Sequence, residues 1–344
     1  MRLLYRYLAP LLLALAFVVV TFGAYVRLSD AGLGCPDWPG CYGQIFVPAT
    51  VAAVAQPEQL VARPLSVGKA WKEMIHRYLA SFLGLLILTQ ALLAWRLWRA
   101  GEPLHRAPLL LVPLVGLQGL LGMWTVTLLL KPLVVTAHLL GGFSVVALLV
   151  WQLNVTTVPA ARRVGRGLTV WVVSALVALS GQVFLGGWTS SNYAALACTD
   201  FPRCHGSLWP TMNFRDAFVM WRGLGVNYEF GVLDTPARTA IHFTHRLWAV
   251  VASLGVIAAA VQAIRTRSLA GRRLGWCILA ALTLQVSLGI TNVVRGLPLP
   301  VAVAHNGAAA LLLGSLVTLL YFATRPLRLA GDGDYEQPAA ASHP

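Results

Sequence analysis

Three ionisable side chains stand together in the segment Glu73-Met74-Ile75-His76-Arg77, at the start of a long apolar run. Such groups are costly at membrane depth and usually have a function there. Glu73 and His76 are three residues apart, so a helix would place them on one face. An acid at such a site can accept a proton, and an imidazole can ligate a metal. The chemistry depends on what this face contacts.

The composition is that of a polytopic membrane protein. Of the 344 residues, 58% are hydrophobic and only 11% are charged, which excludes an ordinary soluble multidomain enzyme. The formal charge of +14 does not indicate a nucleic-acid partner, because the chain has no long basic run. Its arginines form small clusters between apolar segments, as expected of loops on one side of a membrane.

Eight apolar segments are each close to the roughly 20 residues that cross a bilayer. They lie at about 8–26, 74–95, 109–129, 133–152, 168–188, 241–264, 274–294 and 301–323. Arg2 and Arg6 precede the first segment, as in a signal peptide, but its apolar run is long and no small-residue cleavage site follows closely. We therefore expect a permanent helix.

Arginine clusters follow the second, fourth, sixth and eighth segments, so the positive-inside rule places both termini in the cytoplasm. The long loops at about 27–73 and 189–240 are then external, and the protein is expected in a bacterial-type inner membrane. The polar tail 331–344 is predicted to be a disordered cytoplasmic segment.

The chain is also an internal repeat. The motif Gly34–Gly43 aligns with Ala197–Gly206 at an offset of 163 residues, with cysteines, acid, aromatic, proline and final glycine in common. His76-Arg77 recurs as His245-Arg246 at an offset of 169. At an offset of 167, two further matches are Leu117-Gln118 plus Gly122 with Leu284-Gln285 plus Gly289, and Ala137-His138 with Ala304-His305.

This offset spans four helices, an even number, so both halves have the same orientation in the membrane. The predicted fold is an all-α membrane protein of eight transmembrane helices, arranged as two parallel-repeat four-helix bundles. The N-terminal bundle is assigned to residues 1–160 and the C-terminal bundle to residues 161–330.

Each half supplies two histidines at matching positions, His76 with His138 and His245 with His305. All four lie a few residues inside the predicted outer helix ends, roughly 4 to 10 Å deep. A single buried histidine commonly serves packing, but two repeated pairs favour axial ligation of haem iron. Zinc fits less well, because no third and fourth ligands recur. Arg77 and Arg246 follow two of the histidines and suit either haem propionates or interfacial anchoring.

The cysteines form two pairs of equal spacing, Cys35 with Cys41 and Cys198 with Cys204. If the loops are external, both pairs can form disulfides that close short loops over the histidine sites. The alternative is a redox-active thiol pair, and zinc binding suits the spacing and position poorly. Cys277 is alone in an apolar run, where we expect it to pack between helices.

Several of these motifs together resemble the haem A synthase family, which is a family of membrane enzymes. They are Arg27-Leu28-Ser29-Asp30-Ala31-Gly32-Leu33-Gly34-Cys35-Pro36-Asp37-Trp38-Pro39-Gly40-Cys41, Glu73-Met74-Ile75-His76-Arg77, Gln118-Gly119-Leu120-Leu121-Gly122, Thr136-Ala137-His138, His242-Phe243-Thr244-His245-Arg246 and Ala304-His305-Asn306. The first external loop and the glutamate-histidine motif are the specific parts of this resemblance.

The resemblance implies a reaction in which a methyl group of haem O is oxidised to the formyl group of haem A, through successive hydroxylations. His76 and His138 match the family's substrate haem site. His245 and His305 match the pair that holds a haem b, which relays electrons. Haem O, membrane lipid, a haem O synthase, oxidase assembly factors and an electron donor are the implied partners, and a homo-oligomer is compatible with the family.

Glu73 is the asymmetric residue of the repeat, because the offset of 169 places it opposite His242. We therefore predict that Glu73 serves the substrate site alone, as proton acceptor or electrostatic stabiliser. The competing interpretation is structural, since Glu73 is in a first helical turn and forms an i, i+4 pair with Arg77. His242 also lies three residues before His245, although the repeat favours His245 as the ligand.

Two other classes of protein share some of these features. A membrane cytochrome with two haems b would explain the repeat and the four histidines, but it does not need an acid in one half only. A parallel-repeat transporter could use histidines in a proton path, but such a path would distribute them through the membrane instead of at one depth.

Overall fold

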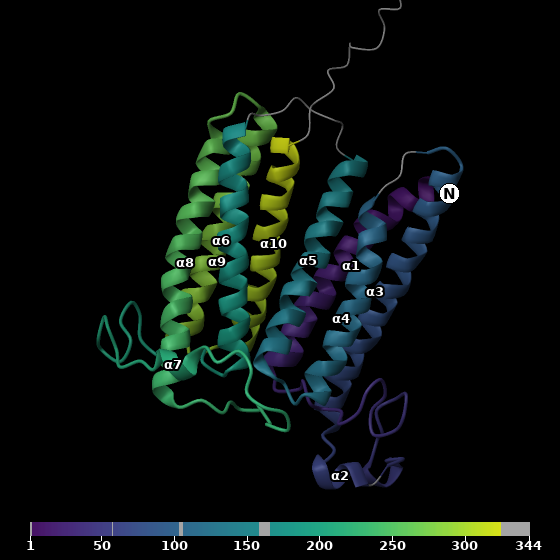
Figure 1. Ribbon diagram of the computed structural model, residues 1–344, viewed down its shortest axis with the longest axis vertical. Helices are drawn as coiled ribbons and strands as arrows, with labels where there is room; N and C mark the ends of the chain where they lie inside the picture. Colours follow the sequence, from purple (N-terminus) through teal and green to yellow (C-terminus); the bar gives the residue numbers. More distant parts are fainter. Residues whose placement is uncertain (1, 57, 103–105, 158–165, 325–344) are drawn as a thin grey trace, which may run out of the picture.

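The computed structural model of the protein describes residues 2–56, 58–102, 106–157 and 166–324 (Figure 1). The predicted tail 331–344 and the predicted boundary between residues 160 and 161 lie outside this part. Within the described residues the chain is helical and contains no β-strand, apart from single bridges between Cys41 and Gln44 and between Cys204 and Ser207.

The eight predicted membrane-spanning segments are confirmed as eight long apolar helices. They are α1 (Arg2–Leu28), α3 (Val67–Arg99), α4 (Arg106–Thr127), α5 (Pro132–Thr157), α6 (Arg166–Ser191), α8 (Thr235–Ile264), α9 (Leu269–Val294) and α10 (Leu299–Thr324). The protein is therefore a multi-pass membrane protein. The connecting segments hold three short helices, η1 (Val51–Ala53), α2 (Glu58–Ala62) and α7 (Phe214–Ala217).

Two helices start earlier than their apolar runs. Helix α3 begins at Val67, where Lys69, Lys72 and Glu73 lower the hydropathy of the first turns, and helix α8 begins at Thr235, directly after its capping residue. The Asp234 side chain accepts the Ala237 N–H, and Pro236 stands in the first turn of α8. His76 and His245 are thus about 14 Å from their helix starts, so the predicted depth of 4 to 10 Å was wrong for these two residues.

The helices pack in two groups (Figure 1). In one group α1 contacts α3 and α5, and α4 contacts the same two helices; in the other, α8 contacts α6 and α9, and α10 contacts the same two. Helices α5 and α10 join the groups, since α10 contacts α1 and α5 while α5 contacts α6. The division into two parallel-repeat bundles stays a prediction, which these contacts support.

Contacts between the halves are reciprocal. The Asn154 Nδ2 donates to Thr318 Oγ1 at 3.1 Å, and the rings of Trp151 and Tyr321 meet edge to face at 5.5 Å. At the offset of 167, Trp151 corresponds to Thr318 and Asn154 to Tyr321. Each contact is therefore the counterpart of the other, as at a two-fold interface. This reciprocity also supports the predicted repeat.

The second long loop also reaches across to the N-terminal half. The Lys131 ammonium, between α4 and α5, donates to the Gly223 carbonyl at 2.6 Å and lies 3.4 Å from the Trp221 ring centroid. The Tyr228 N–H donates to the Leu129 carbonyl at 3.0 Å. Arg63 and Glu229 form a two-pronged ion pair at 2.9 and 3.2 Å. We call residues 221–229 the crossover strap.

Cys277 does not pack between helices. Its side chain is exposed on the outer face of α9, so the predicted packing role was wrong. The hydropathy of its segment identified a helix but could not show whether the Cys277 face of that helix meets its neighbours.

Candidate functional site

The first disulfide loop is built around one carboxylate. The Asp37 oxygens accept the N–H groups of Tyr42 at 2.6 Å and Gly43 at 2.8 Å. Tyr42 takes a left-handed backbone with φ of 53°, and Gly43 follows with φ of 76°, a conformation that glycine adopts without strain. The Cys35–Cys41 disulfide, with a Cα–Cα distance of 4.9 Å, closes the loop.

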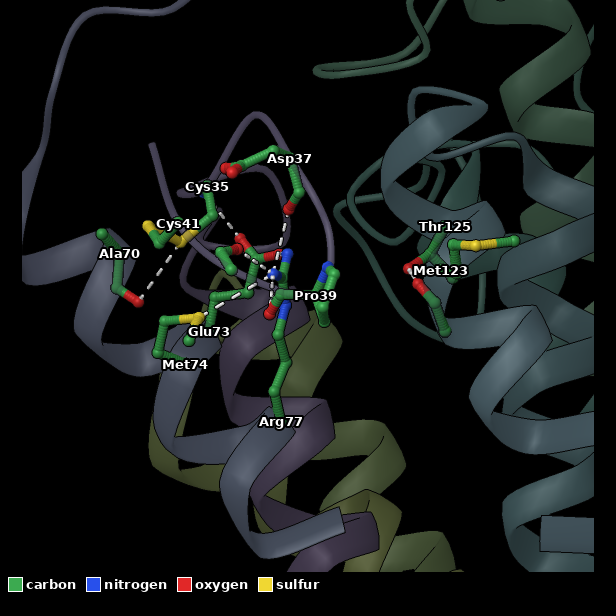
Figure 2. A network of polar contacts seen from close by, with 12 residues as sticks. Cys35, Asp37, Pro39, Cys41, Ala70, Glu73, Met74, Arg77, Met123 and Thr125 are labelled. Carbon is green, nitrogen blue, oxygen red and sulfur yellow. Dashed lines mark hydrogen bonds and ion pairs between the residues drawn. A yellow bond between two sulfur atoms is a disulfide. The ribbon is translucent and has the colours of Figure 1, made fainter. Parts of the chain in front are cut away.

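Glu73 and Arg77 hold this loop on α3 (Figure 2). The buried Glu73 carboxylate, 4% exposed, accepts the Cys35 N–H at 2.9 Å and forms an ion pair with Arg77. The Arg77 guanidinium also donates to the carbonyls of Asp37 at 2.9 Å and Gly40 at 2.5 Å. Both side chains therefore brace the disulfide loop.

The second disulfide loop repeats the first. The Asp200 carboxylate accepts the N–H groups of His205 at 2.7 Å and Gly206 at 2.9 Å, while Cys198 and Cys204 form a disulfide with the same Cα–Cα distance of 4.9 Å. The Gly206 N–H, followed by the His205 N–H, lowers the pKa of the Asp200 carboxyl. The loop-forming role of the motif is thus common to both halves.

His242 occupies the place of Glu73 in the second half. Its Nδ1 lies 3.3 Å from the Cys198 N, and its Nε2 accepts the Arg246 Nε–H at 3.1 Å. Arg246 also donates to the Arg203 and Cys198 carbonyls, each at 2.9 Å. The predicted alignment of Glu73 with His242 is a structural equivalence, and Arg246, which the sequence left without an acid partner, braces its loop in the manner of Arg77.

We expect Arg246→Lys to loosen the second loop. The planar guanidinium of Arg246 reaches His242 and two carbonyls at once. A compact lysine ammonium cannot, so at least one acceptor would lose its donor. We expect a loss of about 1 to 3 kcal/mol of stability, measured as a lower thermal unfolding midpoint of the purified protein in detergent. Arg215→Lys, at an exposed position in the short helix α7, is the matched control. An unchanged midpoint for Arg246→Lys would contradict the bracing role.

Each of the four predicted ligand histidines lies against a glycine on the preceding span. A Cβ atom added to the glycine would lie 2.8 Å from the imidazole Cε1 for Gly23 and His76, 3.5 Å for Gly122 and His138, 3.3 Å for Gly186 and His245, and 3.1 Å for Gly289 and His305. Gly23 corresponds to Gly186 at the offset of 163, and Gly122 to Gly289 at 167. The sequence reasoning missed Gly23 and Gly186, which the first offset could have revealed.

Glutamines accompany the histidines of the C-terminal half. The Gln182 amide nitrogen lies 3.3 Å from His245 Nδ1, and the Gln285 amide nitrogen lies 3.3 Å from His305 Nε2. The structure places Gln182 beside the site, and the sequence reasoning missed this residue. In the N-terminal half, the buried Nδ1 atom of His76 has no hydrogen-bond partner among the described residues.

The residues fit a haem better than a metal ion held by protein ligands alone. The described part of the chain contains no group of three or more His, Cys, Asp or Glu side chains that could hold a metal. His76 and His138 lie on α3 and α5, which both pack against α1 and α4, and His245 and His305 lie on α8 and α10, which both pack against α6 and α9. Two imidazoles in a helical core, with glycines beside them and an unpaired ring nitrogen on His76, could serve as an axial ligand set for haem iron.

Fold and site together define a multi-pass helical membrane protein whose paired histidines lie beneath disulfide-closed loops. The chain belongs to the family of cytochrome oxidase assembly proteins (COX15-CtaA), whose model matches residues 6–317. It is 46% identical to the Heme A synthase of Shewanella oneidensis, over 92% of this chain and 96% of that protein. It is 30% identical to the Heme A synthase of Rhodopseudomonas palustris strain BisA53, over 87% and 85% of the two chains.

Proposed function

We propose that the protein is a haem A synthase, a membrane oxidoreductase that converts a methyl group of haem O into the formyl group of haem A. The observation that carries this proposal is the 46% identity to a Heme A synthase over nearly the whole of both chains. The two histidine pairs support it, because the reaction needs both a substrate haem and a route for electrons.

In this proposal His76 and His138 hold the substrate haem O, and His245 and His305 hold a haem b. A bound haem supplies a redox-active iron. The histidines orient each macrocycle, and the facing glycines leave room for it. The unpaired Nδ1 atom of His76 supports a site with variable occupancy, whereas the glutamine contacts of His245 and His305 support a permanently oriented pair.

Glu73 keeps its proposed role at the substrate site, as proton acceptor or electrostatic stabiliser for the reacting methyl group. Its carboxylate lies one helical turn from His76, which supports the role, and it also braces the first loop. Arg77 and Arg246 are proposed to attract haem propionates, since a guanidinium has five N–H donors to share between loop carbonyls and an anion.

The membrane orientation completes the proposal. Both termini are cytoplasmic, the disulfide loops face the oxidising side of a bacterial-type inner membrane, and haem O arrives from a haem O synthase. The product passes to oxidase assembly, and an electron donor supplies the reducing equivalents. The arginine clusters and the two disulfides support this orientation.

Haem extraction tests the proposal. The protein is produced in a host that makes haem O but not haem A, purified, and its haems are identified by chromatography and mass spectrometry. We expect haem A or its hydroxylated precursor together with haem b. Haem b alone would indicate an electron-transfer cytochrome, and a protein without haem would indicate a transporter; either result would refute the synthase.

Variants of the two histidine pairs test the division of labour between the halves. We expect His138→Ala to abolish haem A formation and to leave the haem b absorption in place. His305→Ala should remove haem b from the purified protein, because one of its two axial ligands is lost. Difference spectra and haem extraction measure both effects. Loss of haem b from both variants would contradict separate sites.

A further inference from the structure

Each disulfide loop is followed by an exposed apolar pair. Ile45 and Phe46 are 73% and 66% exposed, and Leu208 and Trp209 are 70% and 71% exposed. The pairs correspond to each other at the offset of 163. We call them the apolar tips. Neither the haem sites nor the bracing of the loops accounts for large hydrophobic side chains at these positions.

The tips fold back against the membrane-spanning helices. The Tyr78 hydroxyl of α3 donates to the Ile45 carbonyl at 2.5 Å, and the rings of Phe46 and Tyr78 lie 6.4 Å apart. In the other half, the Trp209 ring meets Phe243 of α8 edge to face at 5.3 Å. The tips are therefore held at a defined height along the two helices.

That height coincides with the start of the uncharged helix segments. Residues 78–95 of α3 and 247–264 of α8 contain no acidic or basic residue, and arginines flank both segments at 77, 96, 246 and 265. Each segment has 18 residues, about 27 Å of helix, which matches the hydrocarbon thickness of a bilayer. Tyr78 is the first residue of its segment, and Phe243 lies one turn before the other.

The tips also continue the outward-facing surface of these helices. On α3, Trp71, Ile75 and Phe82 share the helix face of Tyr78 and are 38%, 40% and 55% exposed. On α8, the exposed residues Leu247 and Leu254 share the face of Phe243 and are 56% and 63% exposed. His76 and His245 lie on other faces. A surface that meets lipid therefore runs without interruption into each tip.

We propose that the apolar tips insert into the outer lipid interface and anchor the two disulfide loops on the membrane. Aromatic side chains are favoured in that zone, and the apolar side chains would otherwise stand in water. The lipid partner is the glycerol and upper acyl-chain region of the outer leaflet. Because Glu73, His242 and the two arginines brace the same loops, the anchors fix the outer cover of both histidine pairs to the bilayer surface.

Spin labels measure this insertion. Phe46→Cys and Leu208→Cys are made separately in a Cys277→Ser background, labelled with a nitroxide, and placed in phosphatidylcholine and phosphatidylglycerol nanodiscs. Thr50→Cys, at an exposed position on the first loop, is the matched control. Mass spectrometry of the unreduced protein verifies that both native disulfides persist. Ile45→Cys is the second variant if Phe46→Cys does not fold.

We expect the ratio of oxygen to Ni-EDDA accessibility to be several-fold higher at both tips than at Thr50, because oxygen concentrates in lipid and the nickel complex stays in water. A ratio equal to that at Thr50 would overturn the proposal and place the tips in water. Low accessibility to both reagents would also overturn it, since protein would then cover the tips. The readout does not depend on haem chemistry, so the anchors and the proposed synthase can fail separately.

Discussion

Replacing Glu73 by histidine is expected to lower haem A formation by about 100-fold or more while the first disulfide loop keeps its place. Histidine performs the bracing task in the second half, where His242 lies beside the Cys198 N and accepts from Arg246. The substituted histidine can therefore make the contacts that hold the loop, but the carboxylate is removed. Haem extraction measures the product, and limited chymotrypsin digestion, which can cleave after Tyr42 and Phe46, reports the position of the loop.

Three companion variants make this result decisive. Glu73→Ala should lose both the product and the protease resistance of the loop, because the Cys35 N–H and Arg77 lose their acceptor. Glu73→Gln, with haem retained, should also lose the product. His242→Glu should keep normal haem content and yield, since a carboxylate can accept from both donors. If Glu73→His makes normal amounts of haem A, Glu73 is a brace alone and the proposed catalytic role is wrong.

Gly23→Ala is expected to weaken haem retention in the N-terminal half about tenfold, which corresponds to about 1.4 kcal/mol. The added Cβ would lie 2.8 Å from Cε1 and 3.2 Å from Nε2 of His76, so α1 or the imidazole would have to move. Overpacking of this kind costs about 1 to 3 kcal/mol, and here it also turns a proposed ligand away from the iron. Titration of the purified protein with haem, followed by absorption, measures the affinity.

Gly122→Ala is the matched control in the same half. Its Cβ would lie 3.5 Å from Cε1 of His138, an ordinary contact distance, so we expect near-normal retention. In the C-terminal half, Gly289→Ala should have a larger effect than Gly186→Ala, because the corresponding distances are 3.1 and 3.3 Å. Equal effects of Gly23→Ala and Gly122→Ala would show that the imidazole contact is not what matters.

The sequence was sufficient to predict the spans and the matching of motifs between the halves. Hydropathy located all eight helices, since crossing a bilayer requires a long apolar run whatever the neighbours are. The repeat aligned Glu73 with His242, which a single-motif comparison would have missed. Residue spacing alone, in contrast, did not reveal that both side chains face the first cysteine of a disulfide loop.

Other features depend on packing between distant segments and could not be predicted in this way. The early start of α3 comes from polar turns, and the exposure of Cys277 depends on which face of α9 meets its neighbours. Gly23 stands more than fifty residues from His76, so their contact exists only in the folded bundle. The repeat offset could have identified this glycine as a repeated position, but it could not have revealed the contact with His76.

The crossover strap has a consequence for how the protein is made. Its residues Gly223, Tyr228 and Glu229 contact the N-terminal half, yet a ribosome finishes that half long before it synthesises them. During membrane insertion, the end of the first four spans that carries the first disulfide loop therefore lacks part of its final cover until the second long loop has been synthesised. The order of synthesis gives the N-terminal histidine pair a period of open access that the C-terminal pair does not share.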